Sequence, residues 1–235
     1  MKTYILIFFV ATIFNVINGC TSKDNPLISE EKEQVFYGTI IDEQGYPIEN
    51  VNIHFIPILK EINSNLQKVS NPMSSTRIEF SIPQKTIVNL YVLRYGPRDT
   101  ISYLIKNELL EAGSHSVNFD TYSLKLTCGI YLYVLKYDTV YIEKKMLLVI
   151  NEDDLISSNP FLISDNNGKF QIPYKWFGIN EQFIKSNSLD MNYITTTVTD
   201  SISLFFVKTG YYNKYENYKI DTNYTTRKTI ILKRK

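Results

Sequence analysis

Apolar and polar residues alternate along much of the chain, most regularly between residues 71 and 150. The runs 78–82 and 88–92 carry an apolar residue at every second position, with polar residues or a tyrosine between them. A period of two is typical of a β-strand that buries one face. A proline ends the first run and a glycine–proline pair follows the second, as expected where a sheet ladder stops, because proline has no N–H to donate.

The same segment closes with a second pattern. Residues 130–135 and 141–149 are apolar runs on either side of Asp138 and Thr139, which predicts a hairpin with its turn at these two residues. Several short strands separated by turn residues are typical of a β-sandwich. We therefore predict that residues 71–150 form a sandwich of their own.

Several motifs in this segment carry a family resemblance. In order they are Asn-Pro (71–72), Phe-Ser-Ile-Pro (80–83), Val-x-Leu-x-Val (88–92), Leu-Glu-Ala-Gly-Ser-His (110–115), Gly-Ile-Tyr (129–131) and Lys-Lys-Met-Leu-Leu (144–148). The series resembles the Ig-like domain of flagellar hook-capping (FlgD-like) proteins, and is similar to the C-terminal sorting domains of secreted Bacteroidetes-type proteins. Because the chain continues to residue 235, the resemblance implies a structural or adhesive module more than a sorting signal.

Alternation also occurs on both sides of this segment. Residues 35–41 form a strand candidate, and the turn residues 42–47 come next. In the run 48–55, alternation places Val51, Ile53 and Phe55 on one face and His54 on the other, toward solvent. The run from Gly38 to Ile53 resembles the opening of a carboxypeptidase regulatory-like domain, a transthyretin-like sandwich.

The later motifs of that family occur only after residue 160. They are Ser-Asp-Asn-Asn-Gly-Lys-Phe-Gln-Ile (164–172), a strand ending in Gly210-Tyr211, and a last strand at 229–232. The resemblance thus implies a discontinuous regulatory-like domain, 35–62 plus 155–235, with the FlgD-like sandwich 71–150 inserted in it. Three serial modules are the alternative, but a first module of residues 35–62 is too short to bury its own core.

The predicted fold class is therefore all-β, with two nested Ig-like or transthyretin-like β-sandwich domains after a lipoprotein signal peptide. Residues 63–70 and 151–158 would connect the domains. The nested arrangement requires the strand at residues 51–55 to share a sheet with strands beyond residue 160.

The first residues have the pattern of a targeting segment. Lys2 precedes an apolar run, 4–14, that is too short to span a bilayer as a mature helix. We interpret residues 1–19 as a signal peptide, and the polar residues 20–34 as a flexible tether.

The tetrapeptide Ile-Asn-Gly-Cys at 17–20 resembles a bacterial lipobox. The resemblance implies cleavage before Cys20, a diacylglycerol on its sulfur and an acyl chain, such as palmitate, on its amine. The protein would then be a membrane-anchored lipoprotein, with the outer membrane as its expected location and its β-domains facing the periplasm or the cell surface. An ordinary secretory signal cleaved nearby is the alternative.

Composition narrows the function classes. The 25 basic and 24 acidic residues nearly balance, so there is no basic surplus of the kind that marks nucleic-acid binders. The 18 tyrosines suit half-buried strands as well as interfaces. Four of them form a candidate binding patch for a protein or a carbohydrate: Tyr211, Tyr212, Tyr215 and Tyr218. Ordinary strand and edge positions are the alternative.

Candidate catalytic chemistry is sparse. The two histidines, His54 and His115, fall in different predicted domains, and Cys128 has no partner once Cys20 is lipidated. We expect Cys128 to be a buried small apolar residue. The Asn-Gly in Asp-Asn-Asn-Gly (165–168) favours a hairpin turn over a calcium loop. We predict no catalytic residues, no cofactor and no metal site.

The sequence therefore predicts a non-catalytic structural or binding module of the cell envelope, making protein–protein or carbohydrate contacts. The first alternative is an accessory subunit of an envelope assembly or secretion machine, which a stable stoichiometric partner would favour. The second is an enzyme of unrecognised type, which loss of an activity on mutation of one carboxylate would favour.

Overall fold

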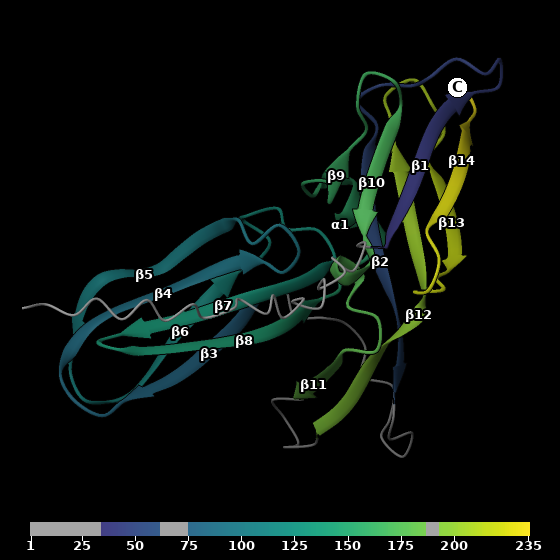
Figure 1. Cartoon of the computed structure of the whole chain (residues 1–235). Coiled ribbons are helices and arrows are strands. Elements are labelled where there is room, and N and C mark those ends of the chain that lie inside the picture. Colours follow the sequence, from purple (N-terminus) through teal and green to yellow (C-terminus); the bar gives the residue numbers. More distant parts are fainter. Residues whose placement is uncertain (1–33, 62–74, 187–192) are drawn as a thin grey trace, which may run out of the picture. The chain divides into compact units, whose positions relative to one another are not determined.

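The computed structural model describes residues 34–61, 75–186 and 193–235, and this part of the chain is all-β (Figure 1). The signal peptide, Cys20, nearly all of the tether and the connector 63–70 lie outside the described residues. The elements are β1 (Val35–Asp42), β2 (Asn52–Glu61), β3 (Ser75–Ile82), β4 (Thr86–Arg94), β5 (Thr100–Leu110), β6 (Gly113–Asp120), β7 (Gly129–Tyr137), β8 (Val140–Leu148), α1 (Glu152–Ser157), β9 (Leu162–Ile163), β10 (Lys169–Pro173), the 3-10 turn η1 (Tyr174–Phe177), β11 (Gln182–Ser186), β12 (Tyr193–Val207), β13 (Lys214–Lys219) and β14 (Thr226–Leu232).

Two sheets share the first core, and we call them the first sheet pair. One has the strand order β10-β1-β14, and the other has the order β11-β12-β2-β9 with β13 also paired to β12. Strand β1 runs parallel to β14, with Phe36 opposite Thr226 and Asp42 opposite Leu232 (Figure 1). Both sheets contribute residues to one buried cluster, which is therefore the core of a sandwich-like unit: Phe36, Ile40, Ile48, Val51, Ile53, Phe55, Phe170, Ile172, Tyr174, Phe177, Ile202, Leu204, Phe206, Tyr218, Ile220, Ile230 and Leu232.

Two other sheets form the second sheet pair. They are the two-stranded sheet β3-β6 and the four-stranded sheet β5-β4-β7-β8. The predicted alternation is confirmed here, since Val88, Leu90 and Val92 are fully buried between the two sheets. The predicted hairpin is confirmed as well, because Tyr137 pairs with Val140 across the two-residue turn between β7 and β8.

The strand pairing expected for the first sheet pair is also present. Strand β2 pairs with β12 and with β9, both of which lie beyond residue 160. By their internal contacts, residues Glu33–Lys235 form one compact unit. The division of this unit into two nested domains therefore stays a prediction.

Two local expectations differ from the structure. The turn at Asp165 and Gly168 exists, since Gly168 N donates to Asp165 O at 2.9 Å. It is not the hairpin we expected, because β9 pairs with β2 while β10 pairs with β1, so the turn links two sheets. The strand expected to end in Gly210-Tyr211 ends earlier, at Val207, and is the long strand β12, which begins at Tyr193 and has an irregularity between Val198 and Ile202.

The connector at 151–158 contains the short helix α1. Asn151 caps it, because its side-chain oxygen accepts from Asp154 N at 2.8 Å. Leu155, on the buried side of the helix, is only 1% exposed. No helix in the described segments is long and apolar enough to cross a membrane.

Candidate binding sites

The four tyrosines at 211–218 do not form a single surface. On β13, Tyr215 and Tyr218 are three residues apart and so face opposite sides of the strand. Tyr218 belongs to the core, with its ring edge-on to Phe36 at 4.8 Å between centroids. Burial raises the pKa of Tyr218, and its hydroxyl donates to Glu216. Tyr218 therefore cannot contribute to an exposed binding patch.

The other three tyrosines lie closer to the surface. Tyr215 stacks on Phe205 with 4.0 Å between ring centroids and is 39% exposed, while Tyr212 is 60% exposed. Tyr211 is half-buried, and the Arg234 guanidinium lies 5.8 Å from its ring centroid. Much of the apolar area of Tyr211 and Tyr215 is thus used inside the protein.

A different set of tyrosines lies on the outer side of the four-stranded sheet β5-β4-β7-β8. We call Tyr91, Tyr103 and Tyr141 the tyrosine face. Tyr91 and Tyr103 are cross-strand neighbours with 5.3 Å between ring centroids. Tyr141 lies on the same side, since its neighbour Ile142 packs into the core. Tyr103 and Tyr141 are about half exposed, at 49% and 53%.

Apolar and charged side chains flank the tyrosine face. The cross-strand pair Ile87 and Leu109 is 55% and 58% exposed. The Lys106 ammonium lies 5.1 Å from the Tyr103 ring centroid. The Tyr141 hydroxyl donates to Glu143 at 2.9 Å, so the face combines exposed rings, aliphatic groups and charges.

Arg98 and Glu143 form an ion pair next to Tyr141 on the tyrosine face. Arg98 donates to Glu143 with 2.6 Å between Nη2 and Oε2. This hydrogen bond is the main reason why the pKa of Glu143 lies below its usual value. The hydrogen bond to Glu143 in turn raises the pKa of Tyr141. Tyr141 therefore has a defined hydroxyl direction on an otherwise open surface.

A groove of about 1000 Å³ opens along β12, where this strand changes partner. The first part of β12 pairs with β11, and the part from Ser201 onward pairs with β13 on the same edge. Between them, Asp200 pairs with Lys219 at 3.6 Å and accepts from Ser201 Oγ at 3.3 Å. The change of partner separates β11 from β13 and so leaves room for the groove.

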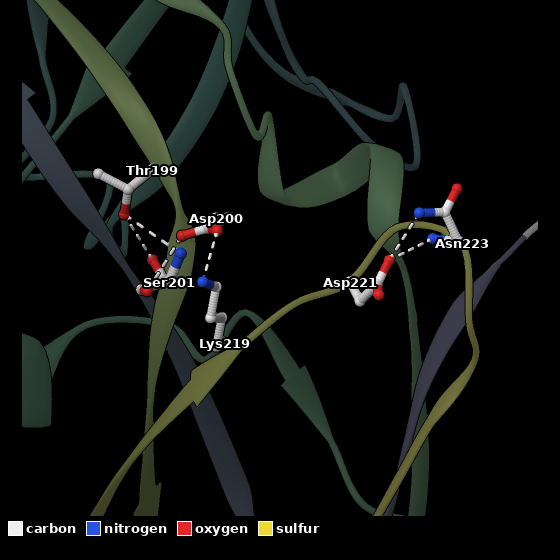
Figure 2. Close-up of polar contacts among 6 residues, drawn as sticks. All are labelled: Thr199, Asp200, Ser201, Lys219, Asp221 and Asn223. Atoms are coloured by element: carbon white, nitrogen blue, oxygen red, sulfur yellow. Dashed lines mark hydrogen bonds and ion pairs between the residues drawn. The ribbon is translucent and has the colours of Figure 1, made fainter.

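Hydroxyl and carboxylate groups lie at the rim of this groove. Thr199 Oγ1 accepts from Ser201 N at 3.2 Å and donates to Ser201 O at 3.1 Å. Asp221 Oδ1 accepts from Asn223 N at 3.0 Å and from Asn223 Nδ2 at 2.8 Å (Figure 2). These contacts hold the polar side chains in place while leaving them open to solvent on one side.

The expectation that His54 faces solvent is wrong, because its ring is fully buried. Its Nδ1 lies 3.1 Å from Thr127 Oγ1 and 3.5 Å from Ser158 Oγ, and its Nε2 has no hydrogen-bond partner among the described residues. Burial lowers the pKa of His54 to about 4. The sheet that contains β2 is therefore covered on the side of His54 as well. A second buried cluster lies there: Cys128, Leu155 and Phe205.

The expectation for Cys128 is confirmed, since its side chain is fully buried. Its sulfur accepts from Ile150 N at 3.3 Å. Burial raises the pKa of the thiol to about 11, which leaves almost no reactive thiolate at neutral pH.

The remaining polar candidates do not assemble into a metal site. His115 is half-buried, stacks on Phe80 with 5.4 Å between centroids, and has its Nε2 2.8 Å from Glu111 O. In the described segments, no group of three or more His, Cys, Asp or Glu side chains is arranged to hold a metal ion.

Sequence reasoning missed both the tyrosine face and the groove. The tyrosine face had a signal, because Tyr91 occupies an outward position between the core residues Leu90 and Val92. The groove had none, since it depends on which strands meet along β12. No protein family, curated protein or solved structure matches this chain, so the function is argued from these surfaces.

Proposed function

We propose that the protein is a non-catalytic, lipid-anchored binding module of the bacterial cell envelope, and that it contacts a partner protein through the tyrosine face. The single observation that supports this proposal is the exposure of Tyr103, Tyr141 and the cross-strand pair Ile87–Leu109 on the outer side of one sheet. Aromatic rings are enriched at protein interfaces, since each buries a large apolar area and keeps a polar end.

The charges around this face suit a protein partner. Arg98 and Glu143 form an ion pair with side chains that are 51% and 27% exposed, and Lys106 lies over Tyr103. An apolar centre with a charged rim is the usual composition of a protein–protein interface. The rim would set the orientation of the partner, and the rings would supply most of the buried area.

The anchor part of the proposal depends on Cys20. A diacylglycerol and an amide-linked acyl chain bury many methylene groups, each contributing about 0.8 kcal/mol to membrane binding. The residues 20–34 would then link the β-sheet unit to the bilayer. Replacing Cys20 by serine is expected to move the protein from the membrane fraction to the soluble envelope fraction.

The partner contact can be tested in cells that produce the full chain. The double substitution Tyr103→Ser and Tyr141→Ser should abolish chemical cross-linking to the envelope partner, because it removes two exposed rings without touching the core. The matched control is Tyr46→Ser with Tyr224→Ser, two tyrosines that are 68% and 70% exposed outside the tyrosine face. Equal cross-linking of both double variants would refute the proposed contact.

The same experiment separates two roles. A partner recovered in constant stoichiometry after detergent extraction would make the chain an accessory subunit of an envelope assembly. A partner seen only after cross-linking would indicate a transient binding module.

A further inference from the structure

The groove along β12 belongs to the first sheet pair, and its role is independent of the function proposed for the tyrosine face. Its apolar lining consists of the partly exposed Ile179 and of Val198 and Ile220, whose side chains are buried beneath the surface of the groove. Its sides carry polar side chains from the end of β2, the middle of β12 and the end of β13. A concave site with an apolar floor and a few polar groups is the usual form of a small-ligand site.

The backbone at the centre of the groove is already paired. Asn180 N donates to Val198 O at 2.8 Å, and Val198 N donates to Glu181 O at 3.0 Å. On the other side, Ile220 N donates to Asp200 O at 2.7 Å. A peptide that binds by adding a strand needs a free sheet edge, and these three bonds occupy the edge. Recognition in this groove therefore depends on side chains.

The polar side chains offer donors and acceptors in similar number. Lys60 and Lys219 contribute ammonium groups, while Glu61, Asp200 and Asp221 contribute carboxylates. The Lys219 and Asp200 side chains are 80% and 49% exposed, so both keep capacity for further hydrogen bonds. Because the charges nearly cancel, the lining does not favour a strongly anionic or strongly cationic ligand.

Hydroxyl groups add to this mixed lining. Thr197 and Thr222 both line the groove. Thr197 Oγ1 is buried and has no hydrogen-bond partner among the described residues. Thr222 is exposed, so its hydroxyl can reach a ligand, whereas Thr197 Oγ1 lies beneath the surface of the groove.

We propose that this groove binds a neutral oligosaccharide. Sugar hydroxyls both donate and accept, which matches a lining of carboxylates, ammonium groups and threonine hydroxyls. The apolar C–H faces of the sugar rings would lie on Ile179, the partly exposed apolar residue of the lining. Asp200, in the middle of β12, and Asp221, just after β13, both line the groove and would accept hydrogen bonds from the sugar.

The test is isothermal titration of the purified full chain with maltotetraose, cellotetraose, xylotetraose, mannotetraose and chitotetraose. Asp200→Asn and Asp221→Asn should each weaken binding by about tenfold or more, because each removes a charge-assisted hydrogen bond. The matched control is Glu79→Gln, an exposed carboxylate on β3 of the second sheet pair. Lys219→Met is a third groove variant, at a side chain that is 80% exposed.

Binding of one tetrasaccharide that is weakened by the three groove variants and unchanged in Glu79→Gln would support the proposal. Absence of binding by all five sugars at millimolar concentration would overturn it. Binding that the groove variants leave unchanged would overturn it as well. Titration with polyglutamate and polylysine completes the test, since binding of either polymer in the groove in place of a sugar would mean that charge alone is recognised.

Discussion

The two sheet pairs use aromatic residues in opposite ways. In the first sheet pair, many aromatic rings are buried in the core: Phe36, Phe55, Phe170, Tyr174, Phe177, Phe206 and Tyr218. In the second, the core is mainly aliphatic, with Phe119 and Tyr131 among its buried residues, while Tyr91, Tyr103 and Tyr141 lie on the outer side of a sheet. Tyrosine content therefore says nothing about binding until each ring is assigned to a face.

The sheet pairs also differ in how the chain builds them. The second uses the residues of β3 to β8, which come one after another in sequence. The first brings together strands from both ends of the described chain, including the parallel neighbours β1 and β14. Large rings that reach across the core suit such an assembly, because each can contact several strands at once. Substitutions of aromatic residues in the two sheet pairs should therefore differ strongly in their cost to stability.

Removing a ring from the first core should have the largest effect on stability. Phe55 is fully buried, with its ring centroid 5.1 Å from that of Phe177 and 5.7 Å from that of Phe161. Phe55→Ala should lower the free energy of unfolding by about 3–5 kcal/mol, since it leaves a cavity. Urea unfolding monitored by the fluorescence of Trp176, the only tryptophan, would measure it. A loss below about 1 kcal/mol would show that the rings do not support this core.

The turn that leads into β10 should be nearly as sensitive. Gly168 has φ +69° and a Cβ there would lie 2.3 Å from Ile40 O, whereas Gly210 has φ +85° and open space around it. Gly210→Ala should cost about 1 kcal/mol for the left-handed backbone alone. Gly168→Ala should cost at least about 2 kcal/mol, because the backbone of β1 must also move. Equal losses in thermal unfolding would mean that the close approach to Ile40 does not matter.

Acidification should lower the free energy of unfolding through the protonation of His54. Burial lowers the pKa of His54 to about 4, so between about pH 6.5 and pH 4 the unfolded chain binds the proton and the folded protein does not. The contribution of His54 to stability is therefore fully present above about pH 6.5 and is lost as the pH falls toward 4, by roughly 3 kcal/mol.

The matched variants isolate this effect from the acid sensitivity of the carboxylates. His54→Leu should flatten the decline of stability between neutral pH and about pH 4, because no buried imidazole remains to be protonated. His115→Gln should keep the decline, since it leaves the buried His54 in place. The comparison is made by urea unfolding at a series of pH values. An unchanged slope in His54→Leu would contradict the assignment.

Removing a ring from the tyrosine face should have the smallest effect on stability. Tyr103→Ser is expected to change the free energy of unfolding by less than about 0.5 kcal/mol, because the ring is 49% exposed and outside the core. Urea unfolding beside Phe55→Ala would measure the contrast directly. A loss as large as that of Phe55→Ala would show that Tyr103 supports the fold, and would weaken its assignment to a partner contact.

Much of the local structure could be predicted from the sequence alone. The period of two at 78–82 and 88–92 correctly indicated strands, and Asp138 and Thr139 correctly indicated the turn of a hairpin. These features depend on neighbours within a few residues, so side-chain alternation and turn chemistry determine them. The burial of Cys128 was predicted as well, because a cysteine without a partner behaves as a small apolar residue.

The candidate sites depend on the tertiary structure. Alternation placed His54 opposite Val51 and Phe55 correctly, but only the packing of Cys128 and Leu155 on that second face made it buried. In the same way, the groove exists because β12 exchanges β11 for β13 along one edge.

Sequence periodicity thus indicates which residues form strands and which side chains share a face of each strand. Tertiary packing determines which strand faces are buried, which tyrosines remain exposed to solvent and where a groove forms. The physical reason is that strand periodicity is a local property of the backbone, whereas burial depends on elements far away in the chain, such as β14 beside β1.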